Sequence, residues 1–276
     1  MNIQKKEKLN RLSQILPEGI VVDASWMEAH GYSRQLRRQY LSSGWIEQPA
    51  RRVYQRPRGA LSWQQIAISL QAMLKLNLVV GGLTALEEQG YAHYLTPNTH
   101  RIMLIGPDKP PTWLESLPSD VEFIYRNDLR LFKNMRATTA PHSLEMNEQT
   151  SLSESGVSIT PWGQWGWPLY FSTPERAILE VLADLPDRES FHQVDMLMEG
   201  LTTLSPSRLN ALLADCCNIK VKRLFLFFAE RHGHAWLKRL DRAQINLGSG
   251  KRVIVKGGKL DPTYHITVPK DLDGIQ

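Results

Sequence analysis

The sequence predicts an α+β protein with an N-terminal winged helix-turn-helix, residues 1–60, followed by a larger mixed α/β domain, residues 61–276. Three observations predict it. Before residue 60, short helical patterns closed by glycines are followed by a basic two-strand pattern. Beyond residue 60, amphipathic helical patterns mix with short apolar runs typical of strands. At 276 residues the chain also exceeds the roughly 250 residues near which single cores stop growing.

The N-terminal region is expected to contain three short helices and then a hairpin. Apolar residues at helical spacing predict the helices at residues 5–16, 24–30 and 34–42. Glycines close the second and the third, and Ser33 is a suitable N-cap for the third. Two apolar-aromatic runs around a basic loop predict a hairpin over residues 45–54, in the place of a wing.

The third expected helix has two different faces. At about 100° per residue, Leu36 and Tyr40 share an inward side, and Leu41 falls towards the outward side. Guanidinium and amide groups elsewhere on the helix can reach bases and phosphates. A solvated basic helix is the alternative, but the basic hairpin that follows favours DNA binding. The candidate DNA-binding residues are Arg34, Gln35, Arg37, Arg38, Arg51, Arg52 and Arg56.

Charge is concentrated at two places along the chain. Residues 1–60 carry eleven Lys or Arg against five acids, and residues 216–260 carry eleven against two. Residues 61–215 are acidic, so the whole chain has a net charge of only +5. This asymmetry indicates that the two basic blocks bind a polyanion while the middle acts as a scaffold.

The larger domain is expected to combine helices, short strands and one long polar loop. Helices are predicted at residues 62–75, 83–89, 176–185, 191–200, 206–215 and 221–231. Strands are predicted at residues 101–105, 121–125, 129–132 and, as a C-terminal hairpin around Gly257-Gly258, at 252–256 and 264–268. Residues 137–155 are polar and weakly patterned, which indicates a flexible surface loop.

Two motifs of this domain have a clear local meaning. Residues 172–175 place a hydroxyl cap, a proline and a glutamate at the start of a helix. Gly81-Gly82 precedes another helix, where close backbone packing is a better explanation than phosphate binding, because no third glycine completes a dinucleotide motif. Three tryptophans at 162, 165 and 167 are more typical of a small sealed core than of a base-stacking platform.

Several function classes are disfavoured. His232 and His234 lack a third metal ligand nearby, and Gly248-Ser249-Gly250-Lys251 lacks the first glycine and the final Ser or Thr of a P-loop. We therefore expect no catalytic site, no metal and no cofactor. A charged N-terminus, two adjacent cysteines and the lack of an apolar run of about 20 residues predict a cytoplasmic protein away from the membrane.

Segments spread over nearly the whole chain resemble the AbiEi family of antitoxins from bacterial abortive-infection toxin–antitoxin systems. The segments that carry the resemblance are VGGLTAL at 80–86, STPERAILE at 172–180, MEGL at 198–201, KVKRLF at 220–225, HAW at 234–236, LGSGKR at 247–252 and YHITVP at 264–269. The N-terminal winged-helix pattern agrees with that family as well.

The resemblance implies an antitoxin that represses its own operon by binding inverted repeats in promoter DNA. It also implies a paired AbiEii-like nucleotidyltransferase toxin, with which a stable complex is not required, and a protein that is monomeric in solution or pairs on DNA. The implied antitoxin surface comprises Lys220, Lys222, Arg223, Lys251, Arg252 and Lys256. Alternatives are a module that binds the toxin directly, a plain winged-helix regulator and, least favoured, an enzyme.

Overall fold

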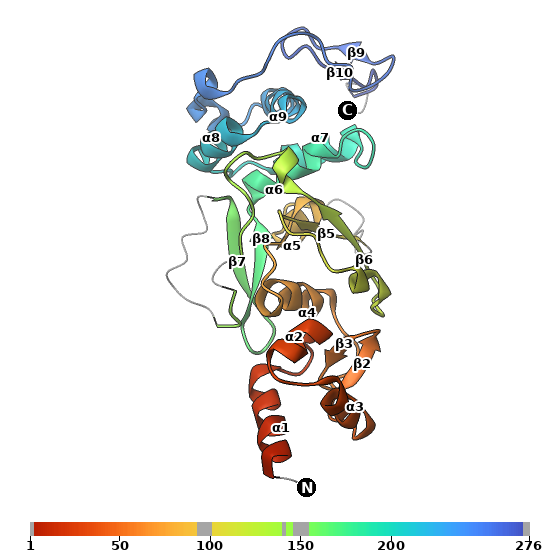
Figure 1. The fold of residues 1–276 in the computed structure, drawn as a ribbon. Helices are drawn as coiled ribbons and strands as arrows, with labels where there is room; N and C mark the ends of the chain where they lie inside the picture. Colours follow the sequence, from red (N-terminus) through yellow and green to blue (C-terminus); the bar gives the residue numbers. More distant parts are fainter. Residues whose placement is uncertain (1–2, 93–100, 140–141, 146–154, 273–276) are drawn as a thin grey trace.

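The chain folds into an elongated molecule with the winged helix at one end and a helical layer at the other (Figure 1). The computed structural model describes residues 3–92, 101–139, 142–145 and 155–272. A five-stranded sheet lies between the two ends. The expected mixed α+β fold, with a small N-terminal and a larger C-terminal part, is confirmed. Most of the long polar segment predicted at residues 137–155 lies outside the described residues.

The N-terminal part has the element order of a winged helix. Its elements are α1 (Ile3–Ile15), β1 (Val21–Asp23), α2 (Ala24–Ala29), α3 (Arg34–Ser42), β2 (Glu47–Ala50) and β3 (Val53–Gln55). The strands form an antiparallel sheet in the order β1-β3-β2. The three predicted helices and the hairpin are confirmed. The three-residue strand β1 was not predicted, because so short an apolar run has no measurable periodicity.

The central sheet has the strand order β6-β5-β4-β8-β7. Its strands are β4 (Val79–Val80), β5 (Arg101–Ile105), β6 (Glu122–Arg126), β7 (Val157–Trp162) and β8 (Trp167–Ser172). The pairs β5–β6 and β4–β8 are parallel and the others are antiparallel. On the chain between β3 and β5 lie α4 (Trp63–Ile68), a π-helical turn (Ser69–Met73) and α5 (Gly82–Glu88).

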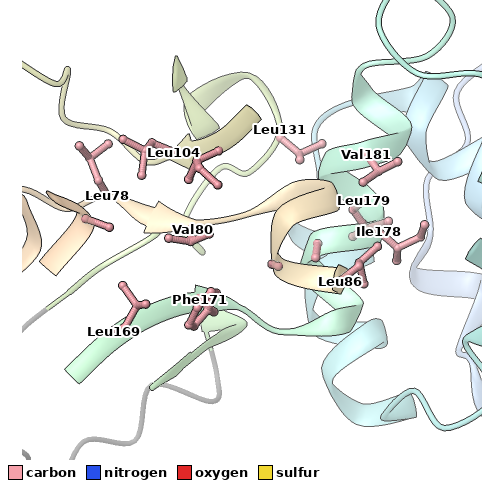
Figure 2. Packing of buried hydrophobic residues seen from close by; sticks show 14 of the residues in the cluster. Leu78, Val80, Leu86, Leu104, Leu131, Leu169, Phe171, Ile178, Leu179 and Val181 are labelled. Carbon is pink, nitrogen blue, oxygen red and sulfur yellow. The ribbon is translucent and has the colours of Figure 1, made fainter. Parts of the chain in front are cut away.

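Helix α6 (Pro174–Ala183) joins the sheet to the helical layer. Side chains of α6 such as Ile178 and Leu179 pack beside Leu86 of α5, next to Val80 and Phe171 of the sheet (Figure 2). The layer beyond α6 consists of α7 (Phe191–Gly200), α8 (Pro206–Asp215) and α9 (Ile219–His232), all of which were predicted. The start of α6 is confirmed, but Thr173 is its N-cap and makes no side-chain capping bond.

Two predicted strands are wrong. Residues 128–130 form a 3-10 helix instead of a strand, because Asp128 is drawn inward and its Oδ2 accepts from the guanidinium of Arg176 at 2.9 Å. Residues 252–256 form no strand, because the Thr267 hydroxyl accepts from the backbone N–H groups of Ile254 and Val255, at 2.9 Å each. The C-terminal hairpin instead pairs β9 (Lys259–Leu260) with β10 (Thr267–Val268). Further 3-10 helices are Thr112–Ser116, Ala235–Arg239 and Arg242–Gln244.

Candidate nucleic-acid interface

Helix α3 is fixed at its start and presents polar side chains outward. The Ser33 hydroxyl accepts from the Leu36 N–H at 3.4 Å, which caps the helix. Tyr40 is buried and Leu36 half-buried on the inner face. On the outer face, Arg34, Gln35 and Arg38 are exposed, as the sequence predicts. The structure thus brings together three donors at the free end of the molecule, where α3 is seen in Figure 1.

Arg37 does not belong to this exposed face. Its residue is only 4% exposed, and its guanidinium donates to Tyr32 O at 2.8 Å and to Glu28 Oε1 at 2.7 Å. It also lies 5.5 Å from the centre of the Tyr54 ring. Arg37 therefore ties α3 to α2 and to β3, and its assignment as a DNA contact is wrong.

The wing carries two of its three predicted cations to the surface. Arg51 and Arg52 are exposed at the tip between β2 and β3. Arg52 has a φ of 64°, and its carbonyl accepts from the Ala24 N–H at 2.9 Å, which joins the wing to α2. Arg56 differs, because it donates to the carbonyl of Ser13 and pairs with Glu18 at 3.0 Å. Arg56 therefore holds the end of α1 and is only half-exposed, and its assignment as a phosphate contact stays a prediction.

Sequence inspection missed one residue beside the predicted interface. Trp45 follows α3 and is 51% exposed, although an indole of this size is usually buried. The backbone N–H of Trp45 donates to Tyr40 O at 2.9 Å, which fixes the backbone of Trp45 to the end of α3. The available signal was an aromatic residue directly after the Gly44 stop of a basic helix. Leu41, the apolar residue on the outward side, is half-buried against the core.

The C-terminal basic region is only partly a surface. Lys251, Arg252 and Lys256 are exposed on the loop that follows the 3-10 helix Arg242–Gln244, and Val253 between them is 62% exposed. These residues belong to one segment, residues 251–256, which we call the basic loop and in which Ile254 and Val255 are half-buried against the core.

The other three predicted members of the antitoxin surface lie on α9 and point inward. Arg223 is 2% exposed and its guanidinium donates to Leu247 O at 2.8 Å and to Gly250 O at 2.7 Å. Lys222 is 4% exposed. Lys220 is half-buried, and its ammonium donates to Ala183 O at 2.8 Å, while burial lowers its pKa. Lys222 and Arg223 are buried, so their assignment to an exposed antitoxin surface is wrong. Lys220 and Arg223 instead hold neighbouring segments through hydrogen bonds to backbone carbonyls.

The histidines near the end of α9 are also engaged inside the protein. His232 Nε2 lies 2.7 Å from Asp195 Oδ1, and His234 Nε2 donates to Met198 O at 2.6 Å. Burial lowers the pKa of His234. Among the described residues, no group of three or more His, Cys, Asp or Glu could hold a metal ion.

The two adjacent cysteines form no disulfide with each other. Cys216 and Cys217 are free thiols, and burial raises the pKa of Cys216 to about 11. None of the helices within the described ranges has the length and apolar character needed to cross a membrane.

The fold and these surfaces define a two-part protein, in which a winged helix-turn-helix with an exposed basic helix is joined to a larger α+β unit that carries a basic loop. Residues 99–269 match a protein family described as "Transcriptional regulator, AbiEi antitoxin, Type IV TA system". Residues 5–97 match a second family, described as the N-terminal domain of the same AbiEi antitoxin regulators. The chain belongs to this family of AbiEi antitoxins, which are transcriptional regulators of type IV toxin–antitoxin systems. The two matches meet near residue 98, and the domain boundary at residue 60 stays a prediction.

The fold is also found among solved structures. The crystal structure of the RV2827C protein from Mycobacterium tuberculosis matches with a TM-score of 0.51 and 15% sequence identity, over 96% of this chain and 91% of that chain. None of the curated proteins matches the chain.

Proposed function

We propose that this antitoxin represses its own operon by binding an inverted repeat in the promoter through α3 and the wing. The observation that carries the proposal is the exposed donor set Arg34, Gln35 and Arg38, which lies at the same end of the molecule as Arg51 and Arg52. Two winged helices would occupy the two half-sites of the repeat, one helical turn of DNA or a multiple of it apart. We also propose that the protein acts in the cytoplasm and is monomeric in solution or pairs on DNA.

The side chains of α3 suit the major groove. Arginine can donate two hydrogen bonds to a guanine, and glutamine can do the same with an adenine. Arg51 and Arg52 at the wing tip would contact phosphates, which fix the orientation of the protein without reading sequence. Because phosphate contacts release counterions, the affinity should fall steeply as salt is raised.

A mobility-shift assay on promoter DNA tests this proposal. The double variant Arg34→Ala, Arg38→Ala should weaken binding by at least about 30-fold, since each bidentate base contact is worth about 1–3 kcal/mol. Lys133→Ala, an exposed cation of the larger domain, is the matched control and should leave the affinity unchanged. Unchanged operator binding by the double variant would show that α3 is not the reading helix.

We further propose that the chain neutralises an AbiEii-like nucleotidyltransferase toxin without catalysis and without a cofactor. The engagement of His232, at the end of α9, and of His234, two residues beyond it, with protein groups supports a structural role for both. His232→Gln and His234→Gln should therefore retain toxin rescue, provided that they fold. Loss of rescue by a folded variant would favour an enzymatic mechanism instead.

A second mode of neutralisation, direct binding of the toxin, is favoured by the basic loop. Lys251 and Arg252 directly precede Val253, which is 62% exposed, and a combination of cations with an exposed apolar side chain suits an acidic protein surface. Co-purification of toxin and antitoxin at moderate salt separates the two modes. A stable complex supports direct binding, and its absence supports action on a shared target.

A further inference from the structure

A cavity of about 700 Å³ lies where the winged helix meets the larger domain. Helix α2 and the end of α1 form one wall, and the residues that end the π-helical turn form another. Loop residues around Lys109 and His142 complete it. Small-molecule sites have volumes of about 300–1,000 Å³ and favour the junctions between domains, so both the size and the place of this cavity suit a ligand.

The wall contributed by the larger domain has an unusual backbone. The segment Ser69–Met73 is π-helical, a conformation that is rare and frequent at functional sites. Lys75, which follows it, has a φ of 56°, and His142 on the facing loop has a φ of 43°. Left-handed backbone is costly for residues other than glycine and clusters at functional sites. At Lys75 it also ends the helical turn, since the Leu76 N–H donates back to Leu70 O at 3.0 Å. Both residues line the cavity.

The wall contributed by α2 is an aromatic platform. The rings of Trp26 and His30 are stacked, with centroids 3.9 Å apart and planes inclined by 24°. His30 is held in this position because its Nδ1 donates to Trp26 O at 2.8 Å. Trp26 is half-buried, so the indole retains accessible surface on the cavity side. Such a platform suits a flat aromatic ring.

The charged groups around the cavity have both signs. Lys75 and Lys109 are exposed at its edge, and they suit phosphate oxygens. Asp23 and Glu145 supply carboxylates, of which Asp23 is also the N-cap of α2 and accepts from the Trp26 N–H at 2.8 Å. Carboxylates are common partners of ribose hydroxyls in nucleotide sites. A ligand that combines an aromatic ring, a sugar and an anionic group would use all three kinds of lining.

We propose that this cavity binds a nucleotide, with the base against Trp26, the phosphates near Lys75 and Lys109, and the ribose near the carboxylates. The site is separate from the proposed DNA-contacting face, since none of the residues that line it belongs to α3 or to the wing.

Occupancy of the cavity is coupled to the proposed DNA-binding helix through α2. Trp26 and His30 belong to α2, and Arg37 of α3 donates to Ala24 O and to Glu28 Oε1 of the same helix. On the other side, the Val21 N–H donates to Ser69 Oγ at 2.9 Å, which joins the winged helix to the π-helical turn. A nucleotide that contacts both walls would therefore change the affinity of the protein for its operator, and DNA would change the affinity for the nucleotide by the same factor. This coupling rests on the proposed function, whereas the site does not.

Calorimetric titration of the full chain with ATP, GTP, CTP and UTP tests the site. At least one of them should bind saturably, and adenosine or tripolyphosphate alone should bind at least tenfold more weakly, because each offers only part of the contacts. Trp26→Leu, which keeps an apolar side chain, should weaken nucleotide binding about tenfold through the loss of stacking. Trp165→Leu is the matched control, because Trp165 is 64% exposed and does not line the cavity.

A second variant tests the site independently, in case Trp26→Leu does not fold. Lys75→Asn with Lys109→Gln removes both cations, and asparagine tolerates the left-handed backbone at position 75. This variant should weaken nucleotide binding about tenfold and leave adenosine binding unchanged. Absence of binding by all four nucleotides, or equal affinity in wild type and both variants, would overturn the proposal.

The coupling is tested separately by mobility shift with and without the nucleotide that binds. A change of at least threefold in operator affinity, lost in Trp26→Leu, supports control of DNA binding by the cavity. An unchanged operator affinity at saturating nucleotide would overturn the coupling. If the protein bound no promoter DNA at all, the proposed function would fail, and the titration would still decide whether the nucleotide site exists.

Discussion

Arg176 and Glu180 lie one turn apart on α6 and form an ion pair of 2.8 Å, with side chains 0% and 2% exposed. The same guanidinium pairs with Asp128 Oδ2 at 2.9 Å, and the second oxygen of Glu180 accepts from the Gly82 N–H at 2.8 Å. One buried charge thus connects α6 to α5 and to the 3-10 helix that replaces the strand predicted at residues 129–132. This network explains why charged residues occur in the otherwise apolar STPERAILE segment.

Replacement of Arg176 should strongly destabilise the protein. Arg176→Met leaves Asp128 and Glu180 buried without their cation, and such broken pairs typically cost about 3–5 kcal/mol. Urea unfolding followed by circular dichroism measures the loss. Arg188→Met is the control, because Arg188 pairs with Asp184 from a side chain that is 60% exposed, and surface pairs contribute about 0–1 kcal/mol. Equal losses in the two variants would contradict the structural role of Arg176.

A methyl group at Gly81 should disturb the same network. A Cβ at this position would lie 2.6 Å from Glu180 Oε2 and 2.6 Å from Ile105 Cδ1, and the carboxylate cannot retreat because its ion pair holds it. We expect Gly81→Ala to cost about 1–3 kcal/mol of stability, the usual range for overpacking. Gly200→Ala is the matched control, because its Cβ would meet nothing closer than 3.7 Å. Equal unfolding midpoints would contradict this explanation of the two glycines.

The sequence was most informative where local chemistry decides structure. Ser33 and Gly44 bound α3 correctly, and α7 and α8 were also placed correctly, because caps and prolines act over a few residues. The hairpin β7–β8 was missed, since its prolines and tryptophans do not follow a simple alternation. The strand predicted at 129–132 failed because Leu131 and Phe132 are buried without pairing in the central sheet.

The sequence predicts the exposure of individual site residues less well than it predicts helix boundaries. Arg37 and Arg38 are adjacent on one helix and equally plausible as DNA contacts, yet one is buried against Glu28 and the other is exposed. Arg223 and Arg252 are both cations of one basic region, and only the structure shows that Arg223 clamps a loop from inside. Whether a given cation is buried against a tertiary partner or stays exposed depends on contacts between segments far apart in the sequence. No local sequence pattern contains that information.

Neighbouring arginines of α3 should therefore separate stability from DNA binding. Arg37→Leu removes charged hydrogen bonds to Tyr32 O and Glu28 and should cost about 1.5–3 kcal/mol of stability. Arg38→Leu should change stability by less than about 0.5 kcal/mol, as exposed substitutions usually do. Operator affinity, measured by mobility shift under conditions where both variants are folded, should fall in Arg38→Leu. The reverse pattern would exchange the roles of the two residues.

Glu189 should make stability depend on pH near neutrality. Burial, together with the charges of Asp184 and Glu87, raises the pKa of Glu189 from 4.5 to about 7, against the opposing effect of Arg101. Since the pKa is higher in the folded state, the favourable contribution of the protonated carboxyl is complete below about pH 4.5 and is lost as the pH rises through about 7. Glu189→Gln should therefore be more thermostable than wild type at pH 8 and similar at pH 4.5.

Thermal unfolding across this pH range checks the effect. Glu199→Gln, which changes an exposed glutamate on α7, is the control and should follow the wild-type curve. A Glu189→Gln curve that runs parallel to wild type from pH 4.5 to pH 8 would show that Glu189 does not titrate in this window.

Charge reversal in the basic loop should separate neutralisation of the toxin from repression. Lys251 and Arg252 are exposed and far from α3 along the elongated molecule (Figure 1), so Lys251→Glu with Arg252→Glu should leave operator affinity within about threefold and stability within about 0.5 kcal/mol. Toxin rescue in cells should be lost, because the loop would repel the acidic surface that it is proposed to meet. Lys133→Glu with Arg136→Glu, an equal charge change at two other exposed positions, should retain rescue. If both double variants rescued equally, the basic loop would be a solvated surface without a part in neutralisation; if both failed, net charge and not this loop would be the cause.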